Sequence, residues 1–173
     1  MLCRVLDRYK MIVPSDDLSV AHHLILDGFW ESWITLAMPG LVHPGMRVLN
    51  LGANVGYYAI LLADLVGETG LVVAVDPHPL LTRLLRQSAF LNGFSDRLRI
   101  EQCACAAKSG ACVVAVNDEL LANTAIIGIS TRPLHRETGD TGRRRVHVEA
   151  KEPASIWGAG PGPDLVFMDI EGS

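Results

Sequence analysis

Apolar and polar residues follow two different periods along this chain. Short, continuous apolar runs bounded by Gly, Pro or charged residues are typical of buried strands, and apolar residues repeated every three or four positions are typical of helices. On this basis we predict strands over residues 9–13, 47–51, 71–75, 98–106, 111–116, 146–150 and 164–169. We predict helices within residues 15–38, broken near Gly28, and over residues 54–66, 80–91 and 154–157.

The order of these elements indicates the fold class. Strands and helices alternate from residue 47 onward, which implies right-handed crossovers and a mostly parallel sheet of the Rossmann-like, doubly wound α/β class. We expect a single domain, in which residues 1–45 form an N-terminal strand and helical segment and residues 46–173 form a ligand-binding core. Residues 117–145 show no clear pattern beyond an exposed loop near residues 139–142.

Composition and charge narrow the class of partner. The chain has 173 residues, 49% of them hydrophobic and 20% charged, which fits one soluble domain. A net charge of −4 argues against nucleic-acid binding, which needs clustered Lys and Arg. No apolar run approaches the roughly 20 residues that cross a membrane. We therefore expect a cytoplasmic protein that binds neither nucleic acid nor membrane.

The cysteines indicate a reducing compartment and no metal ion. The four cysteines show no pair of C-x-x-C motifs, so their spacing does not predict a zinc site. Cys103 and Cys105 are expected on one face of a strand, where cysteines usually act as small buried apolar residues.

The most informative segment runs from Val48 to Tyr58. An apolar run meets a G-x-N-x-G turn there, and a second apolar run ends in Asp76, 20 positions after Gly56. Ligands of parallel sheets bind at the carboxyl ends of the strands. We therefore expect the glycine turn, Asp76 and the late acidic residues Asp169 and Glu171 to open onto one crevice.

The turn and the acid predict a nucleoside ligand. Gly52 and Gly56 allow the backbone to approach a ligand closely, and Asn54 is a residue type that tolerates positive φ. The spacing is shorter than the G-x-G-x-x-G of dinucleotide sites, which favours a nucleoside without pyrophosphate, such as S-adenosyl-L-methionine. Asp76 can accept hydrogen bonds from two ribose hydroxyls, and Pro77 fixes the chain direction after it.

These residues together resemble the FkbM-type methyltransferases, which have the class I S-adenosylmethionine-dependent fold. The resemblance extends from about Tyr9 to Ser173 and is carried by three segments. These are Gly52–Tyr58, Val75–Pro79 and Asp169–Gly172.

The resemblance implies a function and a set of site residues. Residues of the first motif would border the methionine part of the cofactor: Asn50, Gly52, Ala53, Asn54, Gly56 and Tyr57. Asp76 and Pro77 would lie at the ribose, and the segment around Cys105 would lie beside the adenine. Asp169 and Glu171 would lie near the sulfonium and the acceptor, as candidate catalytic bases. The family's usual reaction is O-methylation, often of sugars or other polyhydroxylated metabolites.

The chain departs from the family pattern at three places. Asn50 stands where the family usually has Asp, which removes a charge that could meet the cofactor's ammonium, and Phe167 stands where the family has Lys. The family's sheet also continues beyond the late acidic segment, whereas this sequence ends at Ser173. We therefore expect either a truncated chain or a partner chain, such as a homo-oligomer, that covers an apolar sheet edge.

Two alternatives to an active methyltransferase stay open. One is a non-catalytic or inactive module that binds S-adenosylmethionine, which the change at Asn50 favours. The other is a nicotinamide-dependent oxidoreductase on a similar sheet, against which the short glycine spacing argues. The acceptor, expected to be a small molecule, is not identified by any motif.

Overall fold

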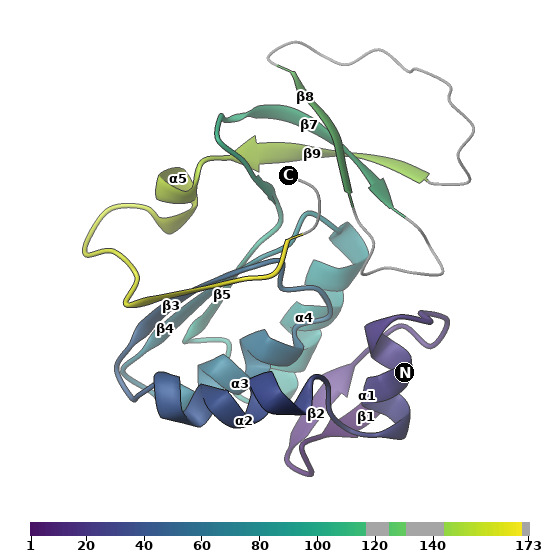
Figure 1. Ribbon diagram of the computed structural model, residues 1–173, viewed down its shortest axis with the longest axis vertical. Helices are drawn as coiled ribbons and strands as arrows, with labels where there is room; N and C mark the ends of the chain where they lie inside the picture. The colour runs from purple at the N-terminus through teal and green to yellow at the C-terminus, as the bar shows by residue number, and fades with distance from the viewer. Residues whose placement is uncertain (117–124, 131–143, 171–173) are drawn as a thin grey trace.

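The computed structural model describes residues 1–116, 125–130 and 144–170. Its centre is a four-stranded, fully parallel sheet in the order β10-β3-β4-β5 (Figure 1). The strands are β3 (Arg47–Leu51), β4 (Leu71–Val75), β5 (Leu98–Glu101) and β10 (Leu165–Met168). The α/β fold with a mostly parallel central sheet is therefore confirmed.

The N-terminal segment is a hairpin followed by two helices. Strands β1 (Leu2–Val5) and β2 (Tyr9–Ile12) pair antiparallel, and helices α1 (Val20–Leu26) and α2 (Ser32–Leu41) follow. Gly28, with a φ of 76°, lies between the two helices, as the sequence indicates. Helix α2 continues through Pro39 to its end, so the expectation that this segment closes before residue 39 is wrong.

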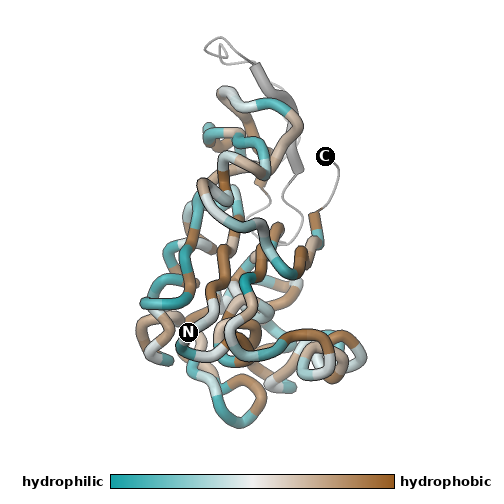
Figure 2. Tube along the Cα trace, turned by 90° about the vertical axis from the view of Figure 1, so that its left-hand side faces the viewer, coloured by the Kyte–Doolittle hydropathy of each residue, from teal (hydrophilic) through white to brown (hydrophobic). Residues whose placement is uncertain are grey.

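Helices α3 (Tyr57–Leu65) and α4 (Pro79–Leu91) pack with the hairpin, α1 and α2 into the larger hydrophobic core. Every residue of α3 from Tyr57 to Ala63 is buried, because the helix lies between the sheet and α2 and has almost no solvent-facing side. The tube in Figure 2 is brown, and so apolar, along much of the central segments, and teal, hydrophilic residues lie mainly in loops.

The other face of the sheet is covered by the short helix α5 (Pro153–Trp157). Ile156 and Trp157 pack there against Leu49, Leu51, Val73 and Val75. The Arg99 guanidinium donates to the carbonyl oxygens of Ile156 and Trp157, at 2.6 and 2.9 Å. Within the described ranges, the helices are thus unevenly divided between the two faces, with α5 alone on one of them.

A second sheet lies beyond the carboxyl ends of the central strands (Figure 1). Its order is β6-β9-β7-β8, and the β7–β9 and β7–β8 pairs are antiparallel. Its strands are β6 (Ala104–Cys105), β7 (Gly110–Val116), β8 (Ala125–Ser130) and β9 (Arg144–Lys151).

Two strand predictions need correction. The strand expected over residues 98–106 is two strands, β5 and β6, which belong to different sheets because the chain leaves the central sheet at Gln102. The strand expected to be buried over residues 164–169 alternates instead, with Val166 and Met168 51% and 61% exposed. Among the described residues β10 pairs only with β3, so one of its sides has no neighbouring strand.

No helix in the described part of the chain is long and apolar enough to cross a bilayer.

Candidate functional site

Three strands of the central sheet end side by side, at the same level of the sheet. Leu51 of β3 is paired with Val75 of β4 and with Met168 of β10. The residues that follow them are Gly52, Asp76 and Asp169, which the parallel register brings to one edge of the sheet. The Asp169 N–H donates to the Leu51 carbonyl at 3.0 Å, so the end of β10 lies directly against the glycine turn.

The glycine turn has left-handed backbone at three positions. The φ angles are 79° at Gly52, 52° at Asn54 and 96° at Gly56. A Cβ on Gly52 would overlap the Asp169 carbonyl oxygen, and one on Gly56 would overlap the Leu85 side chain. Close packing against backbone and a positive φ both require glycine at position 52, whereas at Gly56 the positive φ favours glycine and the Leu85 side chain would have to move to admit a Cβ. Asn54 is the residue type expected at the remaining position.

Asp76 holds the turn in place. Its carboxylate accepts a hydrogen bond from the Asn54 N–H and another from the His78 N–H, both at 2.8 Å. Asp76 is buried, and burial raises the pKa of its carboxyl group to about 6, although the two backbone bonds oppose the change. Each oxygen has made one bond and can accept another, so the carboxylate can support the turn and still bind a hydroxyl. Pro77 lies half-buried beside it.

Asn50 is a buried amide without a hydrogen-bond partner among the described residues. It is 1% exposed, and its neighbours in the sheet are Ala74 of β4 and Phe167 of β10. It lies on the same face of β3 as Val48, which is the face that packs into the larger hydrophobic core. Neither its Oδ1 nor its Nδ2 bonds to any described residue. A buried polar group left in this way costs about 1–3 kcal/mol. Such a group is expected to bond to an ordered water or to a ligand.

The remaining predicted residues lie at different depths. Cys103 is buried and Cys105 half-buried, and both pack on the α5 side of the sheet. Burial raises the pKa of the Cys103 thiol to about 11, which keeps it protonated. Ala53 is buried in the turn, and Asp169 is exposed. Glu171 lies outside the described residues. In the described part, no three His, Cys, Asp or Glu residues converge as metal ligands.

A hydrogen-bonded link between α2 and α3 adjoins the turn. The Tyr57 and Thr35 hydroxyls lie 2.9 Å apart, and the Tyr58 hydroxyl donates to Glu31 at 2.9 Å. The Tyr58 ring also packs on Phe167 of β10, with centroids 4.7 Å apart. Burial and the Glu31 carboxylate both raise the pKa of Tyr58. No sequence pattern indicates these contacts, because they join side chains more than 20 positions apart.

Residues 31–92 match the family model of protein-L-isoaspartate(D-aspartate) O-methyltransferase. The matched segment resembles a methyltransferase. It runs from the start of α2 to the end of α4 and contains Asn50, the glycine turn and Asp76. A similar protein is protein-L-isoaspartate O-methyltransferase 1 of Archaeoglobus fulgidus, which is 36% identical over 52 residues. That alignment covers 30% of this chain and 24% of the relative, so the chain spans about a quarter of the relative's length.

Two solved structures show partial likeness to this chain. Trm5b from Pyrococcus abyssi aligns with a TM-score of 0.44 and 19% identity, over 58% of this chain and 27% of its own. The O-methyltransferase from Bacillus cereus, in complex with SAH, aligns with a TM-score of 0.35 and 20% identity, over 50% of this chain and 35% of its own.

The family match supports S-adenosyl-L-methionine as the cofactor of this chain. It supports a methyltransferase in general terms, and the more specific resemblance to the FkbM type stays a prediction.

Proposed function

We propose that this chain binds S-adenosyl-L-methionine at the shared edge of β3, β4 and β10 and transfers its methyl group to an acceptor oxygen. The observation that carries the proposal is the convergence of the glycine turn, the buried Asp76 and the end of β10. Asn50 would supply hydrogen bonds to the methionine part, Asp76 would bind the ribose, and the segment at Cys105 would lie beside the adenine.

The chemistry asked of the chain is modest. When bound, the cofactor supplies a methyl group on a sulfonium, which is already a strong electrophile. The protein's contribution is to align the acceptor oxygen and, where the acceptor is a hydroxyl, to accept its proton. Asp169 is our candidate for that base, because the residue is exposed and its backbone packs against Gly52. Glu171 is the second candidate.

Two acceptor classes are suggested, one by the resemblance to the FkbM type and one by the match to the family model. The FkbM resemblance favours a hydroxyl of a sugar or another small polyhydroxylated metabolite. The relatives are named for protein L-isoaspartate, and that acceptor is also an oxygen nucleophile. Methyl transfer from radiolabelled cofactor to a sugar panel and to an isoaspartyl peptide separates the two classes.

The cofactor proposal is tested by calorimetric titration with S-adenosylhomocysteine. We expect binding by the native chain and about tenfold weaker binding by Asp76→Asn, because a charge-assisted hydrogen bond is replaced by a neutral one. Asp96→Asn is the matched control, since Asp96 is 67% exposed and its ion pair is with its neighbour Arg97. A folded chain that binds no S-adenosylhomocysteine would contradict the proposal.

A non-catalytic binding module is the second candidate, and Asn50 favours it. The amide brings no charge to the buried position where related enzymes are expected to carry an acid. Retained S-adenosylhomocysteine binding without transfer to either acceptor class would support this candidate. Transfer that is lost in Asp169→Asn would exclude it. NADH binding tighter than S-adenosylhomocysteine binding would instead favour an oxidoreductase.

A further inference from the structure

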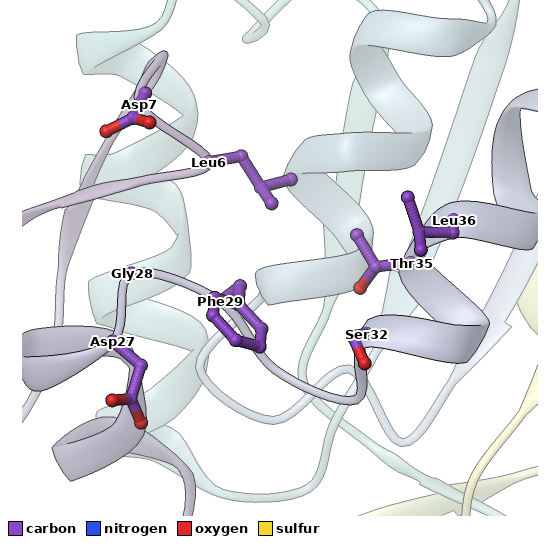
Figure 3. A pocket seen from close by; sticks show the side chains of 8 residues that line it. All are labelled: Leu6, Asp7, Asp27, Gly28, Phe29, Ser32, Thr35 and Leu36. Carbon is purple, nitrogen blue, oxygen red and sulfur yellow. The ribbon is translucent and has the colours of Figure 1, made fainter.

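A pocket of about 350 Å³ lies between the β1–β2 turn, the segment that joins α1 to α2, and the first turns of α2 (Figure 3). Its volume falls in the range of small-molecule sites, roughly 300–1,000 Å³. Its walls include three apolar side chains and three polar ones: Leu6, Phe29, Leu36, Asp7, Asp27 and Ser32. None of them belongs to the predicted cofactor site.

The turn that supplies one wall has an unusual backbone. Leu6 and Asp7 have φ angles of 51° and 54°, in the left-handed region that costs a non-glycine residue about 1–2 kcal/mol. The Leu6 N–H donates to the Gly28 carbonyl at 2.8 Å, which fixes the turn against the α1–α2 connection. Strained residues that a fold retains tend to cluster at ligand sites, and here the strained pair places both side chains on the pocket.

The apolar part of the pocket is open to solvent. Leu36 is 79% exposed and Phe29 45% exposed. Leu6 faces Thr35 and Leu36 across the pocket (Figure 3). The Thr35 hydroxyl is already used, since it donates to the Trp30 carbonyl and lies 2.9 Å from the Tyr57 hydroxyl. This side of the pocket therefore offers apolar surface to a ligand.

The charged part of the pocket is acidic. Asp7 and Asp27 lie on the side away from α2 (Figure 3). Asp27 is paired with His23 at 3.0 Å, whereas the Asp7 carboxylate has no hydrogen bond or ion pair with any residue in the described ranges. The lining contains no Lys, Arg or His from the described part of the chain. A carboxylate accepts hydrogen bonds and attracts positive charge.

We propose that this pocket binds a small organic cation, namely a primary amine or a guanidine carried on an apolar or aromatic body. The body would contact Leu6, Phe29 and Leu36, and the cation would lie at Asp7. The proposal does not depend on the methyltransferase proposal, because none of the residues that line the pocket belongs to the predicted cofactor site.

Two probes of similar size and opposite charge test this site. We expect phenethylamine to bind the native chain at least fivefold more tightly than 3-phenylpropionate, measured by protein-detected NMR titration. Asp7→Asn should weaken amine binding about fivefold, the effect of one exposed charge pair. Leu36→Gln should weaken both probes through the loss of apolar contact. Leu36 is so exposed that this change leaves the fold intact.

The control is Asp16→Asn, which removes an exposed acidic charge outside the pocket. It should leave amine binding unchanged. Equal binding of the two probes, no binding of the amine, or equal losses in Asp7→Asn and Asp16→Asn would each overturn the proposal. S-adenosylhomocysteine titration of the same variants keeps the two sites apart, since Asp7→Asn should bind that ligand normally.

Discussion

At the scale of single residues, Asn50 is where stability and binding are expected to conflict. Replacing it with Leu, a side chain of similar shape, removes two polar atoms that have no partner among the described residues. We expect Asn50→Leu to raise the free energy of unfolding of the unliganded chain by about 1–2 kcal/mol. The same variant should lose most of its S-adenosylhomocysteine affinity.

Urea unfolding and calorimetry measure the two effects of Asn50→Leu. Val48→Leu is the control, because Val48 is buried on the same face of β3 and its replacement shows what altered packing alone does. A destabilised Asn50→Leu chain would mean that the amide of Asn50 is hydrogen-bonded in the unliganded protein.

Asp76 gives a prediction about pH. The pKa of its carboxyl group is about 6 in the folded chain, against 3.8 for the unperturbed group, chiefly because it is buried. Between these values the folded state binds more protons than the unfolded state, so the free energy of unfolding falls as pH rises from about 4 to 6. The loss attributable to this group is on the order of 2–3 kcal/mol.

Asp76→Asn cannot titrate and should lack this part of the pH dependence. The contribution of Asp76 is isolated by measuring urea unfolding of the native chain and of the variant at pH 4, 5, 6 and 7. The variant also changes two backbone hydrogen bonds, but that offset does not vary with pH. Parallel curves for the two chains would contradict the prediction.

At the scale of elements, the contact between the glycine turn and β10 is the most sensitive. Gly52→Ala needs a left-handed alanine and a Cβ that overlaps the Asp169 carbonyl oxygen. We expect a loss of at least about 3 kcal/mol in the free energy of unfolding, measured by urea denaturation. Gly93→Ala is the matched control, because Gly93 has a φ of 71° and open space around its Cα. It should cost only about 1 kcal/mol. Equal losses would show that β10 does not pack on the turn.

The elements that could be predicted from the sequence are those whose limits are marked locally. Strand β4 is a continuous apolar run that ends at Asp76, and α4 has Pro79 at its start and Asn92 at its end. The break between β5 and β6 carries no such mark, because Gln102 and Cys103 fit a strand as well as a bend. Strand β8 is not predicted because its apolar residues lie in a stretch without a recognisable period.

The sequence predicts which residues meet at the candidate site, but not the contacts that they make there. The turn and the two acids follow from residue types and from the rule that parallel strands end at one edge. The two roles of Asp76 as turn support and buried acid, and the unpartnered amide of Asn50, depend on neighbours distant in sequence. The acidic pocket is not predicted, since its residues come from three separate segments.

At the scale of the whole molecule, the apolar side of β10 is expected to promote association. Val166 and Met168 are 51% and 61% exposed on a strand with one described neighbour, and exposed apolar edges pair with other chains. We expect the sedimentation coefficient of the native chain to rise with concentration. Replacing both residues with Lys should abolish that rise.

Leu18→Lys is the control for the association experiment, since Leu18 is 63% exposed but lies outside the sheet. Its sedimentation should match that of the native chain. If Leu18→Lys abolished association as well, general surface hydrophobicity rather than the strand edge would be responsible.

The pairing of β10 with β3 joins two segments that are synthesised at different times. The Asp164 carboxylate accepts a hydrogen bond from the Arg47 N–H, a contact between residues 117 positions apart. During synthesis the chain grows at about 5–20 residues per second. Strand β3 therefore leaves the ribosome several seconds before β10. Throughout that interval the glycine turn lacks the backbone that packs on Gly52, and one edge of β3 is open to chaperones and to other nascent chains. The glycine turn is thus synthesised well before the β10 backbone that completes its packing.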